Sequence, residues 1–228
     1  PAPAVTIPCG IGVYLYHHGR ERPWSSGIWW AVWCGNNRLI YVCVGIEGLN
    51  GDFMKELKGV VLAGGTGSRL LPLTKVTNKH LLPVYDKPMI YYPIQTLVNA
   101  GIREIMIVTG GNNAGEFLRL LGDGRAFVLS HLDYTYQAQA GGIAEALALT
   151  GNFGGQEKIG LMLGDNVIKG NIKDAVHNFE NQKLGAKILL SEVENPKAYG
   201  IANIRDGRIA GIEEKPEHPK SNHAVIGI

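Results

Sequence analysis

The feature that most constrains the fold is a short apolar run that leads directly into a cluster of glycines. Residues 58–63 read Lys-Gly-Val-Val-Leu-Ala, and Gly64-Gly65-Thr66-Gly67 follow without a break. A run of this length and composition predicts a buried strand. Glycines after a strand let backbone N–H groups approach and surround phosphate oxygens. The sequence therefore predicts a strand that ends in a phosphate-binding loop.

Two better-known phosphate loops do not fit this segment. A Walker A loop requires Gly-Lys followed by Ser or Thr, whereas Gly67 is followed by Ser68 and Arg69. The dinucleotide-binding fingerprint requires a third glycine where this chain has Leu70, and an acidic ribose ligand about twenty residues on. The segment matches neither the Walker A loop nor the dinucleotide fingerprint, so it belongs to another class of phosphate-binding site.

Short apolar runs alternate with amphipathic stretches along residues 54–228. The pattern predicts an α/β fold with a largely parallel, mixed sheet and helices on both faces. Such sheets bind ligands beyond the C-terminal ends of their strands. We expect strands at 58–63, 103–109, 132–137, 159–163 and 186–193, helices at 89–100, 113–121, 142–150 and 172–184, a hairpin at 199–204 and 208–212, and the ligand site at 63–69, 109–112, 137–142 and 164–166.

Residues 1–53 differ abruptly in composition from the rest. They contain all four tryptophans and all three cysteines of the chain. The cysteine spacing matches no zinc-ligand pattern, and three is an odd number for a disulfide framework. We interpret the segment as an N-terminal extension of uncertain origin, ahead of a core that begins at Met54. It is either an accidental or weakly ordered extension or a hairpin of residues 28–34 and 38–46 around Gly35-Asn36-Asn37.

Composition and charge exclude several classes of function. With 45% hydrophobic and 18% charged residues the chain can bury a core, and its net charge of +2 is too small to favour nucleic acid or a membrane surface as the main partner. No apolar stretch is long enough to span a bilayer, and no signal-peptide pattern is present. Cytoplasmic localisation is therefore the expectation.

Several polar residues follow the predicted strands with chemistry suited to phosphates. Arg69 can hold phosphate oxygens through two donors, and Lys79 supplies a compact positive charge. Asp165 follows an apolar strand, and Mg2+ commonly binds one or two carboxylates together with substrate phosphates. Gln137 carries both a donor and an acceptor and can pair with a pyrimidine edge.

The segment from Gly64 to Pro93 joins these residues into one long signature. It reads Gly-Gly-Thr-Gly-Ser-Arg-Leu, Pro-Leu-Thr, Lys-His-Leu-Leu-Pro-Val and Asp-Lys-Pro-Met-Ile-Tyr-Tyr-Pro in order. This run closely resembles the N-terminal signature of glucose-1-phosphate thymidylyltransferases, which are sugar-1-phosphate nucleotidylyltransferases with a Rossmann-like fold. Leu-Gly-Asp-Asn at 163–166 and the later Tyr-Gly and Glu-Lys-Pro motifs continue the resemblance to residue 228.

The resemblance implies a role for each matching position. Arg69, Lys79 and Lys215 would be catalytic, and Asp165 would bind Mg2+. His80 matches no catalytic position and is expected to be structural, as is the run 87–93, with a role in subunit contact left open. The nucleotide would be bound by Leu62, Gly64, Gly65, Gly67, Gln137 and Gly142, and the sugar phosphate by Gly200, Glu214, Lys215 and Val225.

The implied reaction is Mg2+-dependent transfer of a nucleotidyl group from dTTP to glucose 1-phosphate. Ala138-Gln139-Ala140-Gly141 stands where many family members have a proline, which leaves UTP open as the nucleotide. The sequence also leaves open a different sugar 1-phosphate as the acceptor, and a non-catalytic nucleotide-sugar-binding fragment or paralogue. The resemblance further implies a homo-oligomer, and a second metal carboxylate beyond residue 228, so that the chain is expected to be C-terminally truncated.

Overall fold

A computed structural model describes residues 57–228, apart from Thr66, Ala140, Gln156 and Asp206, and the backbone of three strands nearer the N-terminus. These strands, β1 (Val5–Ile7), β2 (Ile11–Leu15) and β3 (Trp30–Cys34), pair antiparallel in the order β1-β2-β3. One of the two alternatives for this segment placed a strand at 28–34, and β3 lies within that range. Its predicted hairpin partner at 38–46 lies outside the described residues.

A four-stranded parallel sheet forms the centre of the molecule. Its order is β8 (His131–Gln137), β7 (Glu104–Gly110), β4 (Lys58–Ala63) and β9 (Ile159–Leu163). Val61 of β4 lies opposite Ile107 of β7 and Met162 of β9, and all three side chains are fully buried. The predicted parallel sheet is confirmed, with the glycine loop following one of its two inner strands.

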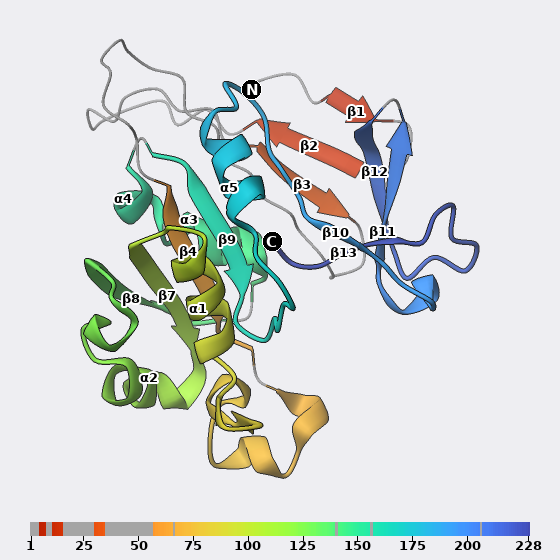
Figure 1. Cartoon of the computed structure of the whole chain (residues 1–228). Helices are drawn as coiled ribbons and strands as arrows, with labels where there is room; N and C mark the ends of the chain where they lie inside the picture. Colours follow the sequence, from red (N-terminus) through yellow and green to blue (C-terminus); the bar gives the residue numbers. More distant parts are fainter. Residues whose placement is uncertain are drawn as a thin grey trace.

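Helices cover both faces of this sheet (Figure 1). On one face, Val61 and Ile107 pack in a core with side chains of α1 (Tyr91–Asn99), α2 (Ala114–Leu121) and α5 (Lys173–Glu180). On the other face, Val60 and Val108 pack against α3 (Ile143–Ala148) and α4 (Gly151–Gly154). Successive residues of each strand therefore pack in opposite cores, because the side chains of a strand alternate between its two faces.

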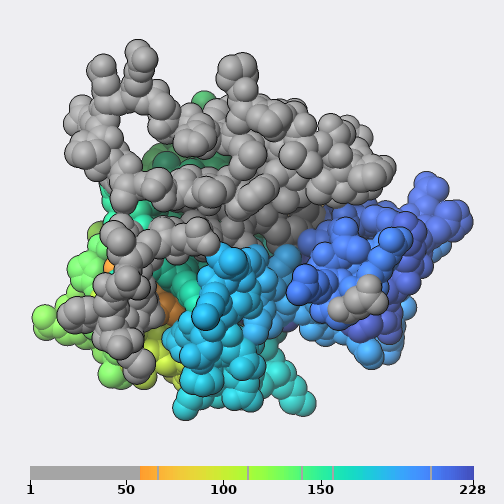
Figure 2. Space-filling model, turned by 90° about the horizontal axis from the view of Figure 1, so that it is seen from above, coloured from red at the N-terminus to blue at the C-terminus, as the bar shows by residue number. Residues whose placement is uncertain are grey.

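A second, antiparallel sheet lies beside the central one (Figure 1). Its order is β10 (Leu190–Glu192), β13 (His223–Val225), β11 (Gly200–Arg205) and β12 (Arg208–Glu214). In the space-filling view its residues form a lobe next to the residues of α5 (Figure 2). The expected hairpin at 199–204 and 208–212 is confirmed as β11 and β12, whereas β13 was not predicted.

The link between β4 and α1 contains short elements only. Three 3-10 helices, Ser68–Leu70, Leu73–Lys75 and Lys79–Leu81, precede a two-stranded ribbon of β5 (Pro83–Val84) and β6 (Lys87–Pro88). The Tyr92 hydroxyl of α1 donates a hydrogen bond to the Val84 carbonyl at 2.6 Å, and the Lys87 ammonium lies 4.6 Å from the Tyr92 ring centre. The ribbon is thus fixed to the first turn of the helix, as the packing role expected for this segment requires.

Helix α5 is shorter than the expected 172–184. It ends at Glu180, where Lys158 binds the carbonyl groups of the last two helical residues and of Gln182, which follows the helix. The Lys158 Nζ donates to the carbonyls of Phe179, Glu180 and Gln182 at 2.7, 2.6 and 2.6 Å. A cation at this end of a helix satisfies otherwise unpaired carbonyls and the helix dipole.

Candidate active site

The C-terminal ends of the four parallel strands meet at the glycine loop. A Cβ added to Gly110, at the end of β7, would lie 3.2 Å from Gly64 Cα and 3.1 Å from the Gln137 carbonyl oxygen at the end of β8. Backbones approach this closely only where a side chain is missing. The ends of β4, β7 and β8 are therefore in contact, at the edge where the sequence placed the ligand site.

The glycine loop turns at Gly67, whose φ of 61° is left-handed. Thr74 fixes this turn, because its Oγ1 donates to the Gly67 carbonyl at 2.9 Å. A Cβ at Gly67 would also lie 2.7 Å from the Thr74 Cγ2. Both the left-handed φ and this close contact therefore favour glycine at the position. The turn leads into the 3-10 helix that carries Arg69, which is exposed.

Asn78 attaches the next part of this segment to the end of β4. Its Nδ2 donates to the Ala63 carbonyl at 3.2 Å, and its Oδ1 accepts from the His80 backbone N–H at 3.0 Å and from the His80 Nδ1 at 2.7 Å. Both side chains are buried. Sequence reasoning missed Asn78, although Asn before a short helical turn is a capping signal.

His80 is a neutral structural residue, as expected. Burial, together with the nearby Lys79 charge, lowers its pKa to about 4. The Nδ1 of His80 donates to Asn78, and the opposite edge of the ring packs against Gly164. A Cβ added to Gly164 would lie 2.8 Å from the His80 Cδ2 and 2.7 Å from the Leu62 carbonyl oxygen. The Gly164 N–H donates to that carbonyl at 2.9 Å. His80 thus holds the end of β9 against the end of β4.

Lys79, in the segment that follows β4, forms an ion pair with Asp165, which follows β9. The Lys79 Nζ lies 2.5 Å from the Asp165 Oδ2, and a Cβ on Gly65 would lie 3.3 Å from the Lys79 Cε. Burial raises the pKa of the Asp165 carboxyl, but the hydrogen bond and charge of Lys79 outweigh it, so the pKa is lowered overall. Asp165 is therefore an anionic carboxylate at neutral pH, beside both the cation and the glycine loop.

The donor chemistry of Asp165 fits a magnesium ion. Mg2+ prefers hard oxygen ligands and is commonly held by one or two carboxylates together with substrate phosphates. Within the described part of the chain, no group of three or more His, Cys, Asp or Glu side chains is arranged to hold a metal ion. Asp165 would contribute one oxygen ligand to such an ion.

Gln137 has a defined amide orientation. Two acceptors, the Gly142 carbonyl and the Glu145 Oε2, each lie 3.2 Å from its Nε2, so this end of the amide carries the N–H groups. The Oε1 end faces Gly64, where an added Cβ would lie 3.3 Å away. Glu145 was missed by sequence reasoning; its position in the first turn of α3, three residues after Gly142, is the signal that could have indicated it.

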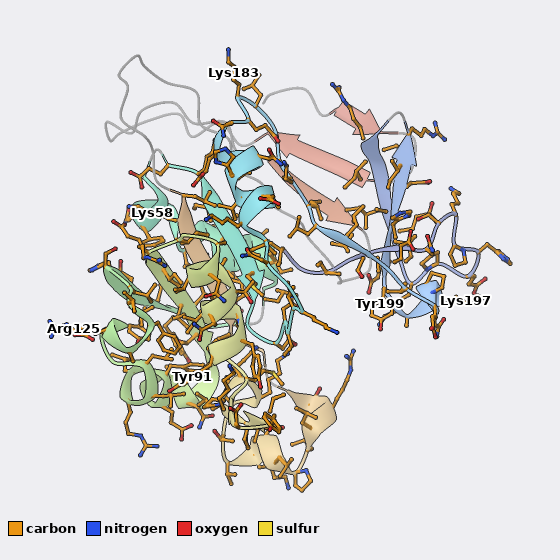
Figure 3. All side chains as sticks on the ribbon, in the orientation of Figure 1. Lys58, Tyr91, Arg125, Lys183, Lys197 and Tyr199 are labelled. Atoms are coloured by element: carbon orange, nitrogen blue, oxygen red, sulfur yellow. The ribbon has the colours of Figure 1, made fainter. Side chains whose placement is uncertain are left out.

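The predicted sugar-binding residues lie together on the second sheet. Gly200 of β11 is paired with Glu214 of β12, and the Lys215 N–H donates to the Tyr199 carbonyl at 3.0 Å. Figure 3 shows Tyr199 on this part of the molecule. The Glu214 Oε2 is buried and has no hydrogen-bond partner among the described residues. Lys215, which is exposed, has its Nζ 4.0 Å from the other oxygen, Glu214 Oε1.

The residues around the glycine loop and the residues of the second sheet are joined close to Asp165. The Leu163 N–H, at the end of β9, donates to the Gly227 carbonyl at 3.1 Å, and the Asn166 Nδ2 donates to the same carbonyl at 3.3 Å. Gly227 follows β13, which carries Val225. The second sheet is therefore anchored on both sides of the Gly164–Asp165 turn.

Comparison with known proteins agrees with this geometry. A family model described as nucleotidyl transferase matches residues 58–228, three quarters of the chain. The chain belongs to the nucleotidyl transferase family. None of the helices in the described residues has the length and apolar composition of a membrane-spanning segment.

Several known proteins are similar to the chain in sequence or structure. Glucose-1-phosphate thymidylyltransferases of Neisseria meningitidis and of an Actinoplanes species are 42% and 45% identical over 75% of the chain, which covers 60% and 56% of their lengths. A putative glucose-1-phosphate thymidylyltransferase from Bacillus anthracis, crystallised with sucrose, is 49% identical, with a TM-score of 0.72 over 75% of this chain and 69% of that one. A UDP-glucose pyrophosphorylase bound to UDP-glucose is 26% identical, with a TM-score of 0.63 over 75% of this chain and 74% of that one. The chain thus spans somewhat over half the length of the curated relatives it matches.

Proposed function

We propose that this site transfers a thymidylyl group from dTTP to glucose 1-phosphate, giving dTDP-glucose and pyrophosphate. One observation carries the proposal: the glycine loop, Lys79 and the anionic Asp165 are in contact at the C-terminal edge of the parallel sheet. Backbone N–H groups, a cation and a carboxylate for a metal are what a nucleoside triphosphate requires. The thymidylyltransferases that are 42% and 45% identical support dTTP and glucose 1-phosphate as the substrates.

In the proposed reaction, a phosphate oxygen of glucose 1-phosphate attacks the α-phosphorus of dTTP in line. A new phosphorus–oxygen bond forms as the bond to the bridging oxygen of the β-phosphate breaks, and pyrophosphate leaves with the electron pair. The attacking oxygen is already anionic, so no general base is needed. The protein must hold two mutually repelling phosphates in line and neutralise the charge that accumulates between them.

The proposed roles follow from the positions of the cations. The glycine loop and Arg69 bind the triphosphate, and Lys79, which lies against Gly65, reaches the phosphate nearest the reaction. Lys215 holds the sugar phosphate, and the unpaired Oε2 of Glu214 accepts a hydrogen bond from a sugar hydroxyl. Asp165 would hold Mg2+, which would neutralise negative charge on the phosphates.

The orientation of Gln137 decides which part of the base it recognises. Its Oε1 can accept a hydrogen bond from the N3–H that thymine and uracil share, while Gly142 and Glu145 hold its Nε2. A UTP-using transferase is therefore the second candidate, and the similarity to the UDP-glucose pyrophosphorylase supports it. Parallel assays of pyrophosphate release, with dTTP or UTP and glucose 1-phosphate, separate the two. Faster release with dTTP is expected, and faster release with UTP would favour the second candidate.

Calorimetry with dTTP, run beside the turnover assay, tests for a third candidate, a binding module. We expect dTTP to bind, and in a chain that also carries the second metal carboxylate we expect Asp165→Asn to lower turnover more strongly than binding. Binding of dTTP without turnover by the unmodified chain would indicate a nucleotide-binding fragment. If dTTP did not bind at all, the assignment of the glycine loop would be wrong.

A further inference from the structure

Lys79 occupies one oxygen of the carboxylate that would bind Mg2+. Its Nζ lies 2.5 Å from the Asp165 Oδ2, which is a short, charge-assisted hydrogen bond. The two side chains are 23% and 37% exposed, so both are accessible from solvent. An oxygen that accepts a hydrogen bond from an ammonium group has fewer lone pairs left for a metal ion. The protein therefore carries a cation of its own at the predicted metal position.

The main chain on both sides of this ion pair is held in place. Asn78 and His80 flank Lys79, both are buried, and the His80 Nδ1 lies 2.7 Å from the Asn78 Oδ1. The His80 ring in turn packs against Gly164, the residue before Asp165. Neither segment can move away from the other without disrupting these buried contacts. The ion pair can therefore separate only through rotation of its side chains, and the flexible four-carbon stem of lysine has the larger range.

The glycine loop offers the Lys79 ammonium a second position. A Cβ added to Gly65 would lie 3.3 Å from the Lys79 Cε and 3.6 Å from its Nζ, so the end of the lysine side chain lies against the loop. The triphosphate is expected on the backbone N–H groups of this loop. Rotation about the terminal bonds of the lysine would carry its charge from the carboxylate to a phosphate oxygen. A single ammonium group is thus within reach of the carboxylate and of the expected triphosphate.

Lys79 and a metal ion compete for Asp165 because both carry positive charge. Mg2+ binds its oxygen ligands at about 2.1 Å, so Mg2+ on the Asp165 Oδ2 would lie no more than about 4.6 Å from a Lys79 Nζ that kept its present contact. The other oxygen belongs to the same carboxylate, so a metal bound there meets the same repulsion at a slightly greater distance. Phosphate oxygens remove this conflict, because they bind the ammonium group and also neutralise the charge of the metal.

We propose that Lys79 is a tethered competitor of the metal ion, which holds Asp165 until a nucleoside triphosphate draws the ammonium group onto its own oxygens. This inference rests on the proposed function and adds an order of binding to it. The metal enters with the nucleotide or after it, and the free ion binds poorly. No covalent bond changes in this exchange. Asp165 replaces a monovalent cation by a divalent one, and Lys79 replaces a carboxylate oxygen by a phosphate oxygen.

Removal of the competitor should strengthen metal binding, a gain that cannot result from misfolding. Mn2+, which shares the oxygen ligands of Mg2+, is the probe, and its electron paramagnetic resonance signal measures the free ion. In titrations of the full 228-residue chain without nucleotide, Lys79→Met should bind Mn2+ about tenfold more tightly than the unmodified chain. Lys75→Met, which removes an exposed lysine of the preceding 3-10 helix, is the matched control and should leave this Kd unchanged. Addition of Asp165→Asn to Lys79→Met should abolish the gain.

Calorimetric titration with dTTP in EDTA tests the transfer of the ammonium group to the triphosphate. Lys79→Met should raise the Kd for dTTP about tenfold, and Lys75→Met should not change it. Equal Mn2+ affinity of Lys79→Met and the unmodified chain, or an equal gain in Lys75→Met, would overturn the competition at Asp165. An unchanged Kd for dTTP in Lys79→Met would overturn the transfer to the triphosphate. If the unmodified chain did not bind dTTP at all, the proposed function would fail, whereas the Mn2+ titration would still decide the competition, so the two failures are distinguishable.

Discussion

If Gln137 binds the base as proposed, its fixed amide should discriminate against cytosine. The Nε2 is held by the Gly142 carbonyl and the Glu145 Oε2, so only the Oε1 is presented toward Gly64 and the site. Thymine and uracil offer an N3–H donor to this oxygen, whereas cytosine offers an unprotonated N3. In the cytosine complex one hydrogen bond is lost and two acceptors face each other in a largely buried position. The residue itself is only 8% exposed.

The size of this effect can be worked from the unpaired groups. Leaving a buried acceptor unsatisfied costs about 1–3 kcal/mol, so the mismatch should cost about 2–4 kcal/mol in total. That corresponds to a Kd about 30- to 1000-fold higher for dCTP than for dTTP. Calorimetric titration of the chain with dTTP, UTP and dCTP in the presence of Mg2+ measures the ratio directly. UTP should bind within about tenfold of dTTP, because it keeps the N3–H.

Glu145 provides the decisive variant. In Glu145→Ala one of the two acceptors that hold Nε2 is gone, so the amide can rotate and offer its donor to cytosine. We expect discrimination against dCTP to fall about tenfold in this variant, and to be retained in Glu145→Gln, whose side-chain carbonyl still accepts. Binding of dCTP as tight as that of dTTP by the unmodified chain would refute the amide orientation. Unchanged discrimination in Glu145→Ala would refute the role of Glu145.

Three further predictions concern charge. Arg69→Ala or Asp165→Asn should lower kcat by about 10²–10³ while leaving the urea midpoint nearly unchanged, and near-normal turnover in either variant would contradict the assigned roles. Lys158→Met removes three hydrogen bonds at the C-terminal end of α5 and should lower the free energy of unfolding by about 2–3 kcal/mol. A loss below about 0.5 kcal/mol in urea denaturation would show that these hydrogen bonds of Lys158 are unimportant for stability. Because burial and Lys79 lower the pKa of His80 from 6.5 to about 4, the unfolded chain binds more protons than the folded chain between these values. Stability should therefore fall by up to about 3 kcal/mol as pH falls from 6.5 to 4, and His80→Gln should flatten that slope in urea titrations at several pH values.

The parallel sheet could be predicted because its signals are local. Strands β4 and β9 occur at the predicted residues, since each is a continuous apolar run bounded by charged residues or glycines. Helix α5 was predicted too long because its end is set by Lys158, which lies more than 20 residues away in sequence. A pattern of apolar residues contains no information about such a contact.

The site was only partly predictable for the same reason. Residues assigned to ligand binding, such as Lys79 and Asp165, were predicted from their type and from the family signature, and the structure brings these two together. Residues that act through another protein group were missed. Asn78 binds the Ala63 carbonyl and Glu145 binds the amide of Gln137, and both partners are identified only once the chain is folded.

The joint between the two sheets places one turn of the chain beside both groups of predicted site residues. Asp165 lies between Gly164, which is pressed against β4 beside His80, and Asn166, which donates to the Gly227 carbonyl. A Cβ at Gly227 would lie 2.6 Å from the Leu163 Cδ1, and the φ of Gly227 is 71°, which is left-handed, so a larger residue at this position would be strained. The strand that carries Val225 is thereby joined to Leu163 and Asn166, the residues on either side of the Gly164–Asp165 turn. If the site performs the proposed in-line transfer, this joint would fix the predicted sugar-binding strand relative to Asp165, so that the two phosphates could meet at one defined position.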